Sequence, residues 1–141
     1  MTRAGHATLN ALRQRWPETR SIVVLCGPGN NGGDGYVVAR IARAQGLRVH
    51  VVAIADPSSL AGDALRAHDE FVAAGGQLER WHPEFVRTGD VIVDAIFGTG
   101  LTREVTALAA ACIHAINAAS RPVVAVDIPS GLQADSGHVL G

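Results

Sequence analysis

The sequence predicts a Rossmann-like, doubly wound α/β domain, in which a mostly parallel sheet carries helices on both faces and forms three layers (αβα). Short, uninterrupted apolar runs alternate along the chain with longer segments whose apolar residues recur at helical spacing. The first of these runs ends in the glycine-rich string GPGNNGGDG, which stands between an expected strand and an expected helix. Strand–helix–strand units of this kind are right-handed, so the strands run parallel and their carboxyl ends meet at one edge.

In the first half of the chain, apolar periodicity and capping residues set the expected boundaries. Leu9, Leu12 and Trp16 share one helical face, and the continuous run SIVVLC is typical of a strand buried on both sides. Strands are expected over 21–26 and 48–55. Helices are expected over 7–16, from Asp34 to a terminating Gly46, and from a cap at Ser58 or Ser59 to Gly75 and Gly76.

The second half continues the alternation of strands and helices. A weak strand is expected over 77–81 and a buried strand over 91–96. The clearest helical stripe of the chain consists of Val105, Leu108, Ala109, Cys112, Ile113 and Ile116. The last expected strand covers 122–128, and it begins with Pro122, at a position where a strand tolerates proline.

The composition narrows the class of protein and its chemistry. The 141 residues suffice for one domain, and 48% hydrophobic with 18% charged residues indicates a soluble, folded protein. A net charge of −1 argues against nucleic acid or an anionic membrane as the main partner. All 12 basic residues are arginine, so a P-loop lysine, a Schiff base and a lysine general base are excluded. The two isolated cysteines fit a reducing cytoplasm.

The loop after the first strand is the main candidate for a ligand site. Its pattern G-x-G-x-x-G lets backbone N–H groups approach an anion at a helix N-terminus. Asn30, Asn31 and Asp34 depart from an ordinary dinucleotide fingerprint, because an acid at the helix start repels a pyrophosphate. Asp34 also has a plainer interpretation as a helix N-cap. Asp56 ends the second strand, where a ribose-binding acid is expected.

Two further loops place an aspartate at the end of a buried strand. Asp94 begins the string DAIFGTGLTRE, and Asp127 begins the string DIPSG. Either loop taken alone is also explained as a turn, with Thr102 of the first string as a helix cap. Because parallel strands bring their carboxyl ends to one edge, the three loops together favour a shared pocket with interacting carboxylates.

The strings GPGNNGGDG, DAIFGTG and DIPSGL, followed closely by ADSG, resemble the NAD(P)HX epimerase family, also called the YjeF N-terminal domain, over essentially the whole chain. The resemblance implies a Rossmann-like isomerase that interconverts the R and S forms of NADHX and NADPHX, which are hydrated nicotinamide cofactors. These dinucleotides would be its substrate and not a cofactor. The family implies a partner dehydratase that restores the cofactors and is fused downstream in many bacteria. A homodimer is compatible with the family.

Carried onto matching positions, the resemblance also implies a set of site residues. One potassium ion (K+) per subunit would be held by Asn31, Asp94 and Ser130, whose oxygen atoms suit a hard cation. Asp127 would face the hydrated ring as the catalytic group. The substrate site would consist of Asn30, Asn31, Gly32, Gly33, Asp34, Gly98, Thr99, Gly100, Leu101, Thr102, Arg103, Glu104 and Asp127.

Two expectations concern the extent of the chain and the rival function. Domains of this family continue past the ADSG segment, so we expect residues 1–141 to form a single domain that is truncated at its C-terminal end. The alternative to the epimerase is a non-catalytic, Rossmann-like nucleotide-binding or interaction module. Such a module is expected to have lost part of the acidic and asparagine set, whereas Asn31, Asp94, Asp127 and Ser130 are all present.

Overall fold

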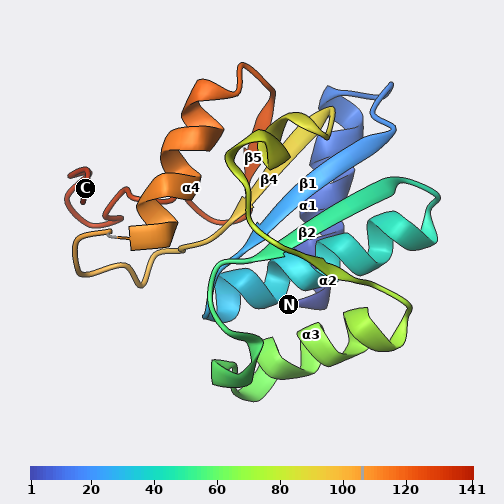
Figure 1. Ribbon diagram of the computed structural model, residues 1–141, viewed down its shortest axis with the longest axis horizontal. Helices are drawn as coiled ribbons and strands as arrows, with labels where there is room; N and C mark the ends of the chain where they lie inside the picture. Colours follow the sequence, from blue (N-terminus) through green and yellow to red (C-terminus); the bar gives the residue numbers. More distant parts are fainter. Residues whose placement is uncertain (106) are drawn as a thin grey trace.

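A computed structural model describes residues 1–105 and 107–141 of the chain. Within these residues, five strands form one sheet in the order β3-β2-β1-β4-β5, and every neighbouring pair is parallel (Figure 1). The strands are β1 (Ser21–Cys26), β2 (Arg48–Ala53), β3 (Leu78–Glu79), β4 (Val91–Ala95) and β5 (Val123–Ala125). The chain therefore runs outward from β1 on one side and returns to β4 on the other. This reversal of direction beside β1 marks the edge at which such sheets bind ligands.

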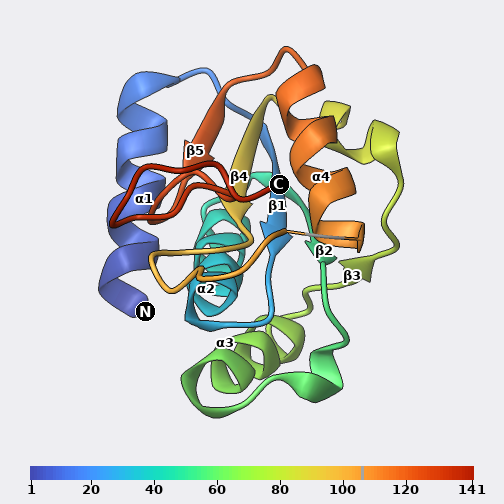
Figure 2. The ribbon, with the colours of Figure 1, turned by 90° about the vertical axis from the view of Figure 1, so that its left-hand side faces the viewer.

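Helices cover both faces of the sheet, which confirms the predicted three-layer fold (Figure 2). The helices α1 (Thr2–Arg15), α2 (Asn30–Ala44) and α3 (Gly62–Ala73) lie on one face, and α4 (Ala107–Ala118) lies on the other. Two short 3-10 helices cover Pro57–Ser59 and Pro83–Arg87. None of the helices in the described residues is long and apolar enough to cross a membrane.

The central strand β1 is buried on both sides, as its uninterrupted apolar run predicts. All six of its residues are buried. Ile22 and Val24 pack toward α1 and α2, whereas Val23 and Leu25 pack toward α4. Because both faces of β1 are covered, the strand holds the loop at its carboxyl end in a fixed position.

The helix after β1 begins earlier than predicted, and Asp34 is not its N-cap. Helix α2 starts at Asn30, after an extended Gly29, so Asp34 lies inside its first turns. Tertiary packing explains the difference, because a Cβ on Gly32 would lie only 1.9 Å from the carbonyl oxygen of Gly27. The glycines that suggested a loop instead let the first turn of the helix lie against β1 and its loop.

Several other boundaries differ from the prediction. Helix α1 begins at Thr2 and not near residue 7, and helix α3 begins at Gly62. Ser58 and Ser59 do not cap α3, because they lie in a 3-10 turn that Asp56 caps through a 2.9 Å bond from the Ser58 N–H to its Oδ1. The weak strand after α3 is reduced to 78–79, and the last strand to 123–125.

Candidate functional site

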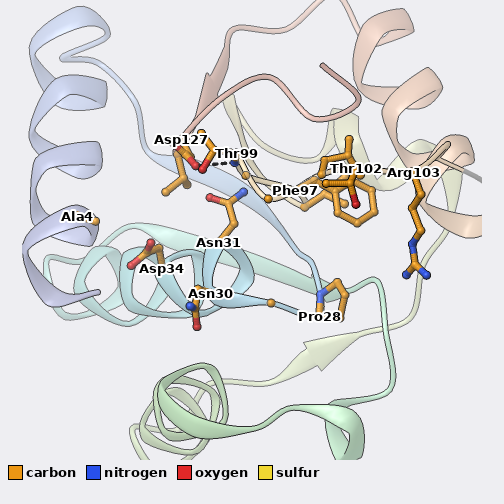
Figure 3. A pocket seen from close by; sticks show the side chains of 16 residues that line it. Ala4, Pro28, Asn30, Asn31, Asp34, Phe97, Thr99, Thr102, Arg103 and Asp127 are labelled. Atoms are coloured by element: carbon orange, nitrogen blue, oxygen red, sulfur yellow. Dashed lines mark hydrogen bonds between the residues drawn. The ribbon is translucent and has the colours of Figure 1, made fainter. Parts of the chain in front are cut away.

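The loops after β1, β4 and β5 enclose a cavity of about 580 Å³ at the carboxyl edge of the sheet (Figure 3). This volume lies within the range of known small-molecule sites. The cavity is lined by Ala4, Pro28, Gly29, Asn30, Asn31, Asp34, Ile96, Phe97, Gly98, Thr99, Gly100, Leu101, Thr102, Arg103, Val126 and Asp127. Parallel β1, β4 and β5 bring these loops together although they are distant in sequence.

Asp127 is held over the cavity by the backbone of the neighbouring loop. Its Oδ2 accepts a 2.9 Å hydrogen bond from the Thr99 N–H, drawn as a dashed line in Figure 3. Its Oδ1 accepts no hydrogen bond from the described residues. A Cβ on Gly98 would lie 2.6 Å from the bound Oδ2, so only glycine leaves room for this arrangement. One carboxylate oxygen is thus fixed while the other is free for a ligand.

Asn31 presents a side chain whose hydrogen-bonding groups have no partner in the described residues. Both its Oδ1 and its Nδ2 are buried and unbonded. In Figure 3 the amide rises from the first turn of α2 toward Asp127 and Thr99. A buried amide without hydrogen-bond partners costs free energy, so such groups in folded proteins usually bind water, an ion or a ligand. The cavity therefore contains a polar group that a ligand can satisfy.

Asp34 lies in the same cavity and is perturbed by it. Removal from water raises the pKa of Asp34, and the negative charge of Asp127 adds to this rise. The ammonium group of Met1, 3.6 Å from Oδ1, acts in the opposite direction. The same Oδ1 is buried without a hydrogen-bond partner. Two carboxylates thus share one cavity and interact electrostatically.

Asp94 and Ser130 form a hydrogen-bonded group beside the cavity. Asp94 is only 5% exposed. Its Oδ2 accepts the Ser130 N–H at 2.8 Å, and its Oδ1 accepts the Ser130 hydroxyl at 2.5 Å. The Ser130 hydroxyl oxygen in turn accepts the Phe97 N–H at 2.9 Å. These bonds tie the loop after β5 to the loop after β4, and thereby hold Asp127 opposite Thr99.

The structure places most of the residues suggested by the sequence around the cavity, but not all of them. Outside its lining lie Gly32, Gly33, Asp94, Glu104 and Ser130. Gly32 packs on the backbone of the first loop, and Gly33 packs on Ala64 and Met1. The exposed Asp56 caps its 3-10 turn and also lies outside the lining. Within the described residues, no hydrogen bond joins Asn31 to Asp94 or Ser130.

The cavity also contains residues that the sequence did not suggest as functional. Pro28, Ile96 and Phe97 belong to the quoted strings, so their position beside the acidic and amide residues was the available signal. Gly29 is also in the lining, and it belongs to the predicted G-x-G-x-x-G pattern. Ala4 belongs to α1, which precedes β1 in the sequence, whereas all other lining residues follow β1. No local pattern marks it, because its place in the cavity depends on how α1 packs against α2.

Comparisons with known proteins show which family the chain resembles over its whole length. A family model described as "YjeF-related protein N-terminus" matches residues 1–141. The chain is 45% identical over its whole length to a protein of Coxiella burnetii named bifunctional NAD(P)H-hydrate repair enzyme Nnr, of which it covers 29%. It is 42% identical to a protein of Bordetella pertussis named NAD(P)H-hydrate epimerase, of which it covers 61%.

A third relative and a solved structure extend the comparison. A protein of Rhodobacter capsulatus, also named NAD(P)H-hydrate epimerase, is 39% identical, and the match covers 96% of this chain and 67% of that one. The crystal structure titled "yeast ynu0, YNL200c" superposes with a TM-score of 0.80 over 94% of this chain and 61% of that chain. At 24% identity, this likeness concerns the fold alone. The chain thus spans only part of the relatives that it matches.

Proposed function

Because the chain belongs to the family of YjeF-related protein N-terminal domains, we propose that it is an NAD(P)H-hydrate epimerase. The substrate would be the hydrated dinucleotide NADHX or NADPHX, bound at the carboxyl edge of the sheet. The observation that carries the proposal is the Asp127 carboxylate, which projects over a cavity of about 580 Å³ with one oxygen fixed by Thr99 and the other free. Family membership suggests the class of substrate, and the Asp127 carboxylate provides a group that can donate and accept the proton in the reaction.

The reaction inverts a carbon that carries a hydroxyl group next to the ring nitrogen. Loss of the hydroxyl as water leaves an iminium cation, and water then adds to the opposite face. In the acid form Asp127 protonates the departing hydroxyl, and in the carboxylate form it takes a proton from the returning water. Its negative charge also stabilises the cation between the two steps. The Thr99 N–H keeps the carboxylate in place throughout.

The decisive assay follows the interconversion of chromatographically separated NADHX epimers. The variant Asp127→Ala is expected to fold and to bind the dinucleotide, but to epimerise it no faster than the spontaneous rate. Asp135→Ala is a matched control, because Asp135 is exposed and its side chain makes no hydrogen bond within the described residues. Wild-type turnover by Asp127→Ala would remove Asp127 from the mechanism. Equal rates with and without the wild-type chain would favour the non-catalytic binding module.

We also propose that Asn31, Asp94 and Ser130 hold a potassium ion. Amide, carboxylate and hydroxyl oxygens form the donor set of a hard cation, and the unpartnered Asn31 amide supplies an oxygen with nothing bound to it. Asp94 offers a buried negative charge, which a cation would balance. When bound, the ion would supply a fixed positive charge at the meeting point of the three loops.

The potassium proposal has its own test. Exchanging KCl for tetramethylammonium chloride at constant ionic strength is expected to weaken dinucleotide binding and to lower the melting temperature. Asp94→Asn is expected to lose this dependence, whereas Asp135→Asn keeps it. An identical response of wild type in both salts would contradict an ion at this site.

The proposed function includes a partner and a cellular setting. The name of the Coxiella relative joins two activities in one chain, so we propose that this epimerase works with an NAD(P)H-hydrate dehydratase, which in some relatives is part of the same protein. The expected setting is the cytoplasm, where the reduced cofactors are used. A homodimer stays a prediction, and sedimentation of the purified chain tests it.

A further inference from the structure

Asp34 is the second carboxylate of the cavity, and the reaction proposed for Asp127 leaves it without a role. Asp34 belongs to α2, whereas Asp127 belongs to the loop after β5, and both line the cavity. The side chain of Asp34 is only 19% exposed. Withdrawing a carboxylate from water costs free energy, so a largely buried carboxylate in a binding cavity is a candidate for a chemical role.

Each of the two carboxylates presents an oxygen atom that makes no hydrogen bond within the described residues. The Oδ1 atom of Asp34 is buried and has no such partner. The ammonium group of Met1 lies 3.6 Å from it, which is longer than a hydrogen bond. Asp127 is held through its Oδ2 by the Thr99 N–H, which leaves its Oδ1 free. Both carboxylates can therefore exchange a proton with a ligand.

The two carboxylates belong to different walls of the cavity. One wall consists of the loop after β1 and the start of α2, and the other consists of the loops after β4 and β5. In Figure 3, Asp34 lies on α2 below the Asn31 side chain, whereas Asp127 lies above it. The two charges are close enough to interact. A flat ring bound between these walls would meet one carboxylate on each of its faces.

Epimerisation by loss and return of water needs proton transfer on both faces of the ring. The hydroxyl group departs from one face of the carbon, and water adds to the other face of the planar iminium cation. A general acid or base acts over a hydrogen bond of about 2.6–3.2 Å, so it must lie beside the oxygen atom that it serves. The departing and the returning oxygen lie on opposite sides of the ring, so each side needs its own group.

We propose that Asp34 is the second acid–base residue of the epimerase and that it serves the ring face opposite to Asp127. This inference rests on the proposed function, and it divides the two proton transfers between the two carboxylates. For one epimer, the Asp127 carboxyl group gives its proton to the hydroxyl. The C–O bond then breaks, water leaves, and the lone pair of the ring nitrogen forms the C=N bond.

The second half of the reaction takes place on the other face of the ring. A water molecule forms the new C–O bond from the side of Asp34 and gives a proton to the Asp34 carboxylate. The electron pair of the C=N bond returns to the nitrogen, so nothing is oxidised or reduced. One proton has then left Asp127 and one has arrived on Asp34. The other epimer follows the same steps in reverse.

The electrostatics of the cavity support this division of roles. Removal from water raises the pKa of Asp34, and the charge of Asp127 adds to the rise, whereas the ammonium group of Met1 opposes it. Two interacting carboxylates favour the state in which they hold one proton between them. That state provides one acid and one base, and the reaction needs both at the same time.

The test compares the isosteric variants Asp34→Asn and Asp127→Asn in two assays on each separated NADHX epimer. Epimer interconversion is followed by chromatography, and uptake of ¹⁸O from labelled water into the hydroxyl group is followed by mass spectrometry. Both variants are expected to epimerise at least about 100-fold more slowly than wild type. Each variant keeps one carboxylate, so each should still exchange the oxygen of one epimer with retention of configuration. The two variants should act on opposite epimers.

Controls separate a chemical role of Asp34 from a structural one. Asp135→Asn makes the same change at an exposed position and should match wild type in both assays. Asp34→Asn should keep the wild-type melting temperature at least, because it removes a charge that burial disfavours. Wild-type epimerisation by Asp34→Asn, or its loss of ¹⁸O exchange from both epimers, would overturn the role of Asp34 and leave the proposed function standing. A wild-type chain that neither epimerises nor exchanges oxygen would instead refute the proposed function.

Discussion

Adding one methyl group at Gly98 should move the Asp127 carboxylate, our proposed catalytic group, without unfolding the protein. In the variant Gly98→Ala, the new Cβ would lie 2.6 Å from Asp127 Oδ2, about 0.8 Å inside the 3.4 Å at which ordinary contact begins. The atom that it meets is the end of a side chain, so Asp127 can turn aside while the backbone stays in place. The 2.9 Å hydrogen bond from the Thr99 N–H is then lost or lengthened.

The size of the effect follows from that displacement. A catalytic group misplaced by about 1 Å can cost roughly 100-fold in rate, so we expect epimerisation to fall roughly 10- to 100-fold. Stability should change by no more than about 1 kcal/mol, because one hydrogen bond at the protein surface is lost and no backbone clash is created. The loss should appear mainly in kcat, since the other lining residues are untouched.

The assay compares Gly98→Ala with Gly100→Ala. A Cβ on Gly100 meets nothing within 4 Å, so the same chemical change in the same loop leaves the Asp127–Thr99 hydrogen bond and the melting temperature unaltered. Because Gly100 also lines the cavity, the rate of Gly100→Ala is expected to fall, but by much less than that of Gly98→Ala. Epimer interconversion is followed by chromatography, and unfolding by urea titration. If Gly98→Ala turns over as fast as Gly100→Ala or as the wild type, the position of Asp127 does not control the reaction and the reasoning fails.

Two further predictions concern the pH dependence of stability. Burial raises the pKa of Asp34, so ionisation of this carboxyl group destabilises the fold. This destabilisation is absent below the pKa of Asp34 in the unfolded state and complete above its pKa in the folded state. Asp34→Asn should therefore gain melting temperature over wild type as the pH rises from 3 to 7, and parallel curves would contradict this. Hydrogen bonds from the backbone N–H groups of Arg20 and Ser21 lower the pKa of Asp90. The ionised Asp90 therefore stabilises the fold above its pKa in the unfolded state, and this stabilisation is lost as the pH falls through its pKa in the folded state. Asp90→Ala should cost about 1–2 kcal/mol at pH 7 in urea unfolding and less near pH 2, and an equal cost at both pH values would refute it.

The order and type of the main elements could be predicted because each depends on local pattern. The uninterrupted runs that became β1 and β4 are apolar on both faces, and only a central parallel strand buries both. Helix starts were less predictable. The glycines before Asp34 have poor helix propensity, yet α2 includes them because their missing side chains allow close contact with β1 and its loop.

The residue types of the site were visible in the sequence, whereas their grouping was not. Strings of glycine, asparagine and aspartate at three strand ends indicated one pocket, and resemblance to a family assigned their roles. Only the fold separates the residues that face the cavity from Gly32 and Gly33, which pack against backbone and side chains inside the domain. Both kinds of glycine occur in the same string, so sequence alone does not distinguish them.

By itself, the sequence determined the layered α/β fold, the edge that carries the site and the chemistry of its side chains. The spacing of apolar residues, the order of the elements along the chain and the type of each residue can all be read from the sequence. The tertiary structure decided which oxygen of Asp127 is fixed and that the amide of Asn31 lacks a partner. These features depend on the distances between chain segments far apart in sequence, and those distances exist only once the strands have paired.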